Sequence, residues 1–247
     1  MHNNRNPDWQ SSAKPVALPN DPFSALDARS IVSHPRYLKS FADLKGKRFA
    51  CKGGTFDLIH MGHIADIPVV QEQMSLDAVV LIPSKIHQVK HAEDKQTIFT
   101  PAQRMGMALL AAEQYSNVYV SPSDLEAPEA VTRTDITLRR IHAEVGNEPG
   151  DKILWIAGFD SLESLPHWAD PNTVLKLASF IVVPRNGKGL AQIDTLGHQH
   201  PDLFPLTVIT ELKENFVQVP ELPISSSELK RDLLAGRPLG NQVPDKV

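Results

Sequence analysis

The chain has 247 residues, of which 41% are hydrophobic and 22% charged, and its formal net charge is −4. These values fit a globular protein with one sizeable core, and they disfavour a general nucleic-acid binder, which usually carries an excess of basic residues. Cys51 is the only cysteine, which excludes an intrachain disulfide. The sequence shows no secretory signal pattern and no apolar run near the roughly 18 residues of a membrane span, so we expect a cytoplasmic protein without a membrane partner.

The first 45 residues differ from the rest of the chain. Residues 1–23 are rich in Asn, Pro and Ser with little hydrophobic periodicity, and Pro35 interrupts a short helical pattern in residues 24–44. We therefore expect residues 1–45 to form a partly irregular extension, followed by a single domain spanning residues 46–247.

From Lys47 onward, short apolar runs typical of strands alternate with helical patterns. The runs lie at 48–53, 77–83, 117–121, 152–158 and 179–184, and the helical patterns at about 62–74, 101–115 and 134–145. Nearly continuous apolar strands separated by helices predict a doubly wound, mostly parallel sheet with helices on both faces, which is a Rossmann-like α/β fold. A weaker strand pair is expected at 206–210 and 215–219, and a last helix within 223–236.

Ligands of such sheets bind beyond the carboxyl ends of the strands, and the first strand ends at Gly53 and Gly54. The stretch CKGGTFDLIHMGHI, residues 51–64, therefore lies at the expected site. Its glycines allow a sharp turn, and a helix starting near His60 offers free N–H groups that suit phosphate. His60 and His63 share one face of that helix, where both can donate to a phosphate oxygen, while Gly62 leaves room for a nucleotide.

The same stretch resembles the GTFDxxHxGH signature of the nucleotidyltransferase superfamily, which transfers a nucleotide from ATP or CTP to a phosphorylated acceptor. The matching residues are Thr55, Phe56, Asp57, His60, Gly62 and His63. ISSSELK, residues 224–230, resembles the superfamily's ISSTxIR motif, whose hydroxyls and helix N-terminus hold the β- and γ-phosphates. Lys230 stands where arginine is usual, so the charge is kept and the bidentate fork is lost.

The middle of the chain resembles one member family, the bacterial nicotinate-mononucleotide adenylyltransferases. GFDSLESLPHW, residues 158–168, is similar to its GxDSLxxFxxW segment, and TRTDITL, residues 132–138, to its SYTxxTL loop, with Arg133 in place of tyrosine. The loop IPSKIHQVKH, residues 82–91, departs from the family's IPxxxPPHK, although Lys90 falls at the basic position. The resemblance runs from about residue 48 to 236.

The resemblance implies adenylyl transfer from ATP to nicotinate mononucleotide in NAD biosynthesis, with small-molecule partners and Mg²⁺ carried by the ATP phosphates. The implied catalytic residues are His60, His63 and Lys230. The implied ATP site comprises Gly53, Gly54, Thr55, Phe56, Gly62, Lys90, Gly158, Asp160, Ser225, Ser226 and Ser227. The implied acceptor site comprises Asp57, Thr132, Arg133, Thr134 and Trp168, with Trp168 stacking on the pyridine ring.

Three alternatives stay open at this point. The enzyme can use another phosphorylated acceptor or CTP, since GTFDLIHMGH also looks like the polyol-phosphate cytidylyltransferases. It can be a degenerate relative that binds a nucleotide without turnover, as Arg133, Lys230 and the altered loop allow. A metal site built from the histidines at 60, 63, 87 and 91 fits less well, because cysteine ligands are lacking.

Overall fold

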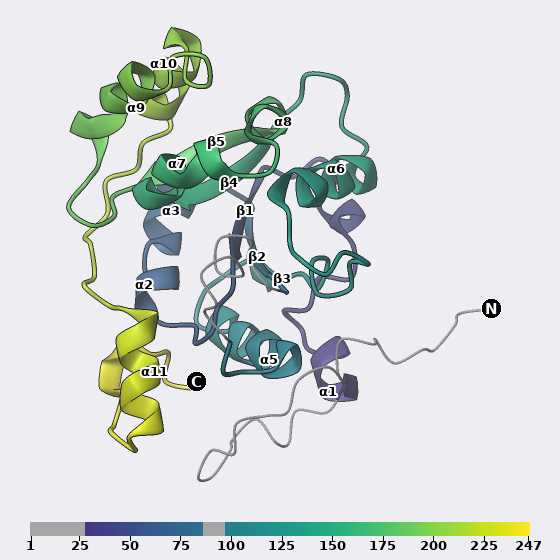
Figure 1. Ribbon diagram of the computed structural model, residues 1–247. Helices are drawn as coiled ribbons and strands as arrows, with labels where there is room; N and C mark the ends of the chain where they lie inside the picture. Colours follow the sequence, from purple (N-terminus) through teal and green to yellow (C-terminus); the bar gives the residue numbers. More distant parts are fainter. Residues whose placement is uncertain (1–27, 86–96) are drawn as a thin grey trace.

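The computed structural model describes residues 28–85 and 97–247 and contains one five-stranded sheet (Figure 1). The strands are β1 Phe49–Gly54, β2 Ala78–Pro83, β3 Val118–Val120, β4 Ile153–Gly158 and β5 Ala178–Val183. All pairings are parallel and the order is β3-β2-β1-β4-β5. The predicted doubly wound sheet is confirmed, and each strand end lies within one residue of its predicted place.

Helices cover both faces of the sheet (Figure 1). The α-helices are α1 Ala28–Val32, α2 Met61–Ile64, α3 Ile67–Gln73, α5 Pro101–Ala112, α6 Thr134–Val145, α7 Phe159–Ser164, α8 Pro171–Leu177, α9 Ile193–Gln199, α10 Leu206–Glu214 and α11 Ser226–Leu234. Short 3₁₀ turns are η2 Phe41–Leu44, η3 Leu165–His167, η4 Leu190–Gln192 and η5 Gly240–Gln242. Residues of α2, α3 and α5 form a core with one face of the sheet, and residues of α6 to α10 form a core with the other.

Strand β1 lies at the centre of the sheet, between β2 and β4. Cys51 is paired with Val80 on one side and with Trp155 on the other. From β1 the chain first adds β2 and β3 on one side of the sheet and then β4 and β5 on the other. A doubly wound sheet binds its ligand at the carboxyl ends of the two strands where the order changes side, here β1 and β4.

The strand pair expected at 206–210 and 215–219 is wrong. Residues 206–210 belong to α10, which starts after Pro205 and buries Ile209 and Leu212 on one face. The β-branched residues of this stretch favour a strand locally, but the spacing of three between its buried residues is that of a helix. Residues 215–219 do run beside β5, where the Val217 N–H donates to the Val182 carbonyl at 2.9 Å, as an isolated bridge.

The described part of the predicted extension packs along the edge strand β3. Ile31, Leu38 and Phe41 are buried, and the Leu38 N–H donates to the carbonyl of Val120 at 2.9 Å. These contacts cover the unpaired edge of β3. Residues 1–27 lie outside the described residues, and the domain boundary near residue 45 stays a prediction. No helix in the described parts of the chain is long and apolar enough to cross a membrane.

Candidate active site

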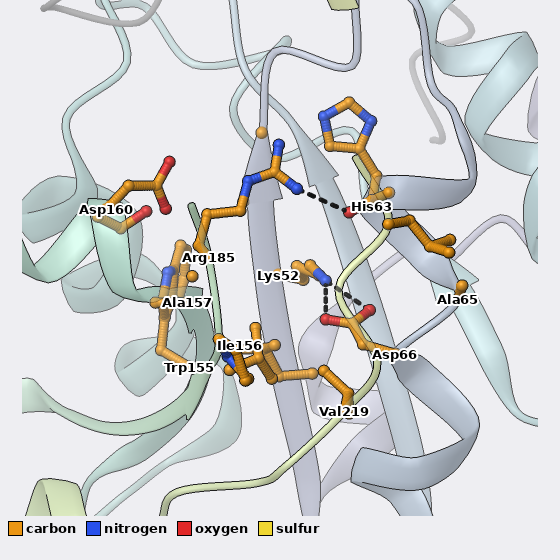
Figure 2. Close-up of a pocket in the computed structure, with 18 of the residues that line it drawn as sticks. Lys52, His63, Ala65, Asp66, Trp155, Ile156, Ala157, Asp160, Arg185 and Val219 are labelled. Atoms are coloured by element: carbon orange, nitrogen blue, oxygen red, sulfur yellow. Dashed lines mark hydrogen bonds and ion pairs between the residues drawn. The ribbon is translucent and has the colours of Figure 1, made fainter. Parts of the chain in front are cut away.

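A cleft of about 230 Å³ opens at the carboxyl ends of β1, β4 and β5 (Figure 2). The predicted site residues that line it are Gly53, Gly54, Gly62, His63, Thr132, Thr134, Gly158, Asp160 and Trp168. The predicted site residues that lie outside this lining are Thr55, Phe56, Asp57, His60, Arg133, Ser225, Ser226, Ser227 and Lys230. Lys90 lies outside the described residues, together with the other predicted loop residues at 87 and 91.

The glycines at the end of β1 make room for two aromatic rings, of which the Trp155 ring lines the cleft. A Cβ at Gly53 would lie 2.7 Å from the Trp155 ring, and one at Gly54 would lie 2.7 Å from the Phe56 ring. Neither distance is compatible with a side chain unless a ring moves. Both glycines are therefore required by packing at the site as well as by the approach of a ligand.

The two histidines of the β1–α2 turn hold each other in place. The rings of His60 and His63 stack with centroids 3.7 Å apart, and the Phe56 ring meets His63 edge-on at 5.4 Å. The backbone N–H of His60 donates to Nδ1 of His63 at 3.3 Å. Because Nδ1 accepts this bond, Nε2 carries the proton in the neutral ring, and His63 presents an N–H donor at the cleft.

His60 has a different position from His63, although the sequence treats them alike. Its side chain is fully buried, and its Nε2 lies 2.9 Å from the Ser226 hydroxyl at the start of α11. The Ser225 side chain makes no capping bond to α11, and Ser226 is turned to His60, so the first-turn N–H groups of this helix are left to an anion. His60 thus joins the two predicted phosphate-binding motifs.

A second contact joins the same two motifs. The Lys230 ammonium lies 3.0 Å from a carboxylate oxygen of Asp57, which is only 2% exposed. The backbone N–H groups of Ile98 and Phe99 also donate to this carboxylate, at 3.1 and 2.9 Å. With these partners Asp57 holds Lys230 in place, and neither residue belongs to the lining of the cleft.

Three of the residues predicted to bind the acceptor, Thr132, Thr134 and Trp168, line the cleft. The Trp168 ring is half-buried against the core, and its indole N–H donates to the Ser164 hydroxyl at 3.1 Å. Thr132 accepts the backbone N–H of Lys85 at 3.0 Å, and Thr134 is the first residue of α6. Together with Asp124 and Trp155, these residues form what we call the Trp168 lobe.

Arg133 does not join this lobe. Its guanidinium turns to the Asp135 carboxylate at 3.0 Å, and the side chain is largely exposed. Asp160 lies at the rim of the cleft, across from His63 (Figure 2).

Arg185 is a cleft residue that the sequence analysis missed. It follows the carboxyl end of β5, reaches across the cleft and donates to the Gly62 carbonyl at 3.5 Å (Figure 2). Its guanidinium adds a positive charge beside the His60–His63 turn. In the sequence, its position just after a predicted strand could have indicated a site residue, because doubly wound sheets bind ligands there.

Arg104 holds the loops that follow β1 and β2. It is 1% exposed, and its guanidinium donates to the carbonyls of Thr55 at 2.6 Å, Ser84 at 2.5 Å and Lys85 at 3.1 Å. These carbonyls follow the ends of β1 and β2, so one side chain fixes the loops after both strands. Burial lowers the pKa of Arg104 to about 10, while the charge of Asp57 acts in the opposite direction.

Among residues 28–85 and 97–247, no group of three or more His, Cys, Asp or Glu side chains is placed to hold a metal ion. The buried carboxylate nearest the histidine turn, Asp57, already has its protein partners.

Comparison with known proteins agrees with this geometry. A model of the cytidylyltransferase-like family matches residues 52–232. The "Probable nicotinate-nucleotide adenylyltransferase" of Roseiflexus castenholzii is 32% identical over 197 residues, which cover 79% of this chain and 90% of that protein. The chain belongs to the nicotinate-nucleotide adenylyltransferase family. It is thus a member of a nucleotidyltransferase enzyme family.

Other relatives of the family give the same result. The protein of the same name from Dehalococcoides mccartyi is 30% identical over 196 residues, which cover 79% of this chain and 89% of that protein. The solved structure of Plasmodium falciparum nicotinic acid mononucleotide adenylyltransferase complexed with NaAD has a TM-score of 0.51 at 16% identity. It covers 75% of this chain and 83% of that chain, and at this identity it supports the fold alone.

We expect the Trp168 to Ala substitution to raise the KM for the mononucleotide by about tenfold or more, because stacking on an aromatic ring is worth roughly 1–3 kcal/mol. The KM for ATP should stay within about twofold. Steady-state kinetics with each substrate varied in turn measures both values. Trp168 to Phe, which keeps a ring, is the matched control. Equal rises in both KM values would mean that Trp168 only packs the core.

Asp124 is a further cleft residue of this family member that the sequence analysis missed. Its carboxylate is buried and accepts the Thr137 hydroxyl at 2.6 Å. Burial raises the pKa of Asp124 to about 6, against the lowering effect of the Thr137 bond and of Arg140, 3.8 Å away. The negative charge of Glu129 adds to the rise. The Trp168 lobe therefore gains a negative charge as the pH rises through about 6.

The raised pKa has a consequence for stability. The folded protein holds this proton more tightly than the unfolded chain, so ionising Asp124 destabilises the fold between the unfolded pKa near 3.8 and about pH 6. Asp124 to Asn should therefore be matched to the wild type at pH 4 and more stable above pH 6, by up to about 3 kcal/mol. Urea unfolding of both proteins from pH 4 to 8 measures the difference. A difference that does not change with pH would contradict this assignment.

Proposed function

We propose that this chain is a cytoplasmic enzyme that transfers the adenylyl group of ATP to nicotinate mononucleotide, releasing pyrophosphate and the deamido dinucleotide. One observation carries the proposal. The 2.9 Å contact between His60 and Ser226 brings together two phosphate-binding motifs that are 166 residues apart in the chain. Both lie beside a cleft that also carries a half-buried tryptophan, as a triphosphate and a flat pyridine ring require.

The reaction is an in-line displacement. A phosphate oxygen of the mononucleotide attacks the α-phosphorus of ATP and forms a new P–O bond. The bond between the α-phosphorus and the bridging oxygen of pyrophosphate breaks, and its electron pair leaves with pyrophosphate. Such transfers depend on positioning and on neutralising charge, so no covalent intermediate on the protein is needed.

The residues divide this work between them. His63 donates through Nε2 to the oxygens around the α-phosphorus, while His60 holds both His63 and Ser226 in place. The first turn of α11 receives the departing pyrophosphate, Lys230 adds positive charge nearby while it is held by Asp57, and Arg185 adds charge from within the cleft. Mg²⁺ enters with ATP as part of the substrate and offsets the charge of the phosphates.

Pyrophosphate release tests the proposal. The assay contains ATP and Mg²⁺ with nicotinate mononucleotide, with nicotinamide mononucleotide, or with no acceptor, and mass spectrometry identifies the product. We expect release with the nicotinate form and formation of the deamido dinucleotide. Release with nicotinamide mononucleotide alone would show that the acceptor is the nicotinamide form. Binding of ATP without release in any reaction would indicate a nucleotide-binding relative and overturn the proposal.

A further inference from the structure

A buried ion pair lines the same cleft. The Lys52 ammonium lies 2.7 Å and 2.5 Å from the two carboxylate oxygens of Asp66, and the two side chains are 11% and 10% exposed (Figure 2). Lys52 lies within β1, and Asp66 directly precedes α3. Taking two charges out of water costs free energy, which their attraction repays only with good geometry and with further hydrogen bonds to the remaining N–H groups and lone pairs.

The Asp66 side chain does not cap α3, although the residue stands at the N-cap position. It occupies the N-cap of α3, where an aspartate usually accepts a backbone N–H of its own helix, but its side chain makes no capping bond. Within the described residues, Lys52 and Asp66 are each other's only side-chain hydrogen-bond partners. The pair therefore keeps one ammonium N–H and two carboxylate lone pairs that no protein group uses.

The walls around the pair are apolar. We call this part of the cleft the Lys52 lobe; besides the pair it is lined by Ala65, Ile156 and Val219 (Figure 2) and by Val183. Ile156, Val183 and Val219 belong to the core on the α2 and α3 side of the sheet, whereas Trp155 and Trp168 pack with the core on the other side. The cleft is thus lined by side chains from the cores on both sides of the sheet.

We propose that the Lys52–Asp66 pair binds the polar edge of the base of ATP and selects a 6-aminopurine. The inference rests on the proposed function, which puts the pyridine ring in the Trp168 lobe and leaves the Lys52 lobe for the base. The aliphatic side chains fit the two faces of a purine ring, and the ion pair lies where the polar edge of that ring would be. The 6-amino group of adenine donates to Asp66, and a neighbouring ring nitrogen accepts from Lys52.

The pair also discriminates against a base whose hydrogen-bond donor and acceptor are exchanged. Inosine has a carbonyl oxygen at position 6 and an N–H at position 1, which reverses the donor and the acceptor. A carboxylate cannot donate and an ammonium cannot accept, and the mutual ion pair holds the two groups in a fixed order. A base with the reversed pattern leaves buried polar groups unpaired, which is the strongest form of discrimination against a close analogue.

The wild-type enzyme provides the first test. Values of kcat/KM are measured for ATP, for purine riboside triphosphate, which lacks the 6-amino group, and for ITP, with the acceptor constant. We expect each analogue to be at least about 30-fold worse than ATP. Calorimetric titration of the same three nucleotides without acceptor gives the same ranking without turnover. Equal use or equal binding of the three would overturn the inference.

The second test replaces the pair by the apolar residues Lys52 to Met with Asp66 to Val, a change that buried ion pairs often tolerate. The preference for ATP over the analogues should fall to within about threefold, while the KM for the mononucleotide stays unchanged. The control removes an ion pair outside the cleft, Lys152 to Met with Glu211 to Gln, whose groups lie 2.7 Å apart. It should keep the full preference.

The outcomes separate the two proposals. A double variant that folds and still prefers ATP as the wild type does would overturn the inference and leave adenylyl transfer intact. Binding that discriminates between the bases in an enzyme that releases no pyrophosphate would support the inference and overturn the proposed function. If the double variant does not fold, the wild-type comparison of the three nucleotides still decides.

Discussion

Replacing His63 with alanine lowers the turnover number for pyrophosphate formation at least about a hundredfold, because it removes an N–H donor aimed at charge that develops in the transition state. The affinity for ATP changes little, since that donor contributes most when the α-phosphorus is attacked. The measurement is kcat from pyrophosphate release, together with ATP binding by calorimetry.

Two controls make the result specific to this site. His198 to Ala removes an exposed histidine of α9 and should leave kcat unchanged. Thermal unfolding of both variants checks that losing the ring contacts of His63 with Phe56 and His60 has not disrupted the fold. A folded His63 to Ala variant with normal turnover would contradict the mechanism.

The second large effect is on stability and comes from Arg104. Arg104 to Met leaves the carbonyls of Thr55, Ser84 and Lys85 without their buried donor. Leaving a buried acceptor without its partner typically costs about 1–3 kcal/mol, so three such carbonyls should lower the free energy of unfolding by at least about 3 kcal/mol. Denaturant unfolding measures the loss.

Arg139 to Met is the matched control, because this arginine is exposed on α6 and should change stability by less than about 0.5 kcal/mol. Arg104 to Lys should recover part of the loss, since an ammonium can still donate to some of the carbonyls. A loss of under about 1 kcal/mol for Arg104 to Met would show that the carbonyls find other partners, and the support assigned to Arg104 would be wrong.

Much of the sheet could be predicted because its strands are buried on both faces. A parallel strand covered on each side must be apolar at nearly every position, and several such short runs separated by helical patterns indicate a parallel sheet. The segment 206–210 has the same local composition but became part of α10, because Pro205 and the burial of Ile209 and Leu212 decide its structure. Local preference alone cannot show which face the rest of the chain will cover.

The site was predictable only where its residues follow one another in a motif. His60, His63 and the serines before α11 stand in fixed short spacings that phosphate binding requires. Arg185 and Arg104 act through the fold, since each reaches carbonyls that are far away in the chain. Lys52 lies inside an apolar run, and nothing in the sequence shows that Asp66, fourteen residues later, is its partner.

The contacts of α11 also decide when during synthesis the enzyme can become active. Ser226 and Lys230 meet His60 and Asp57, which precede them by 166 and 173 residues. A ribosome therefore delivers the central strand and its histidines long before their partners. Until translation has passed Lys230, a nascent chain lacks the α11 partners of His60 and Asp57, so the proposed phosphate site is complete only after α11 has been made.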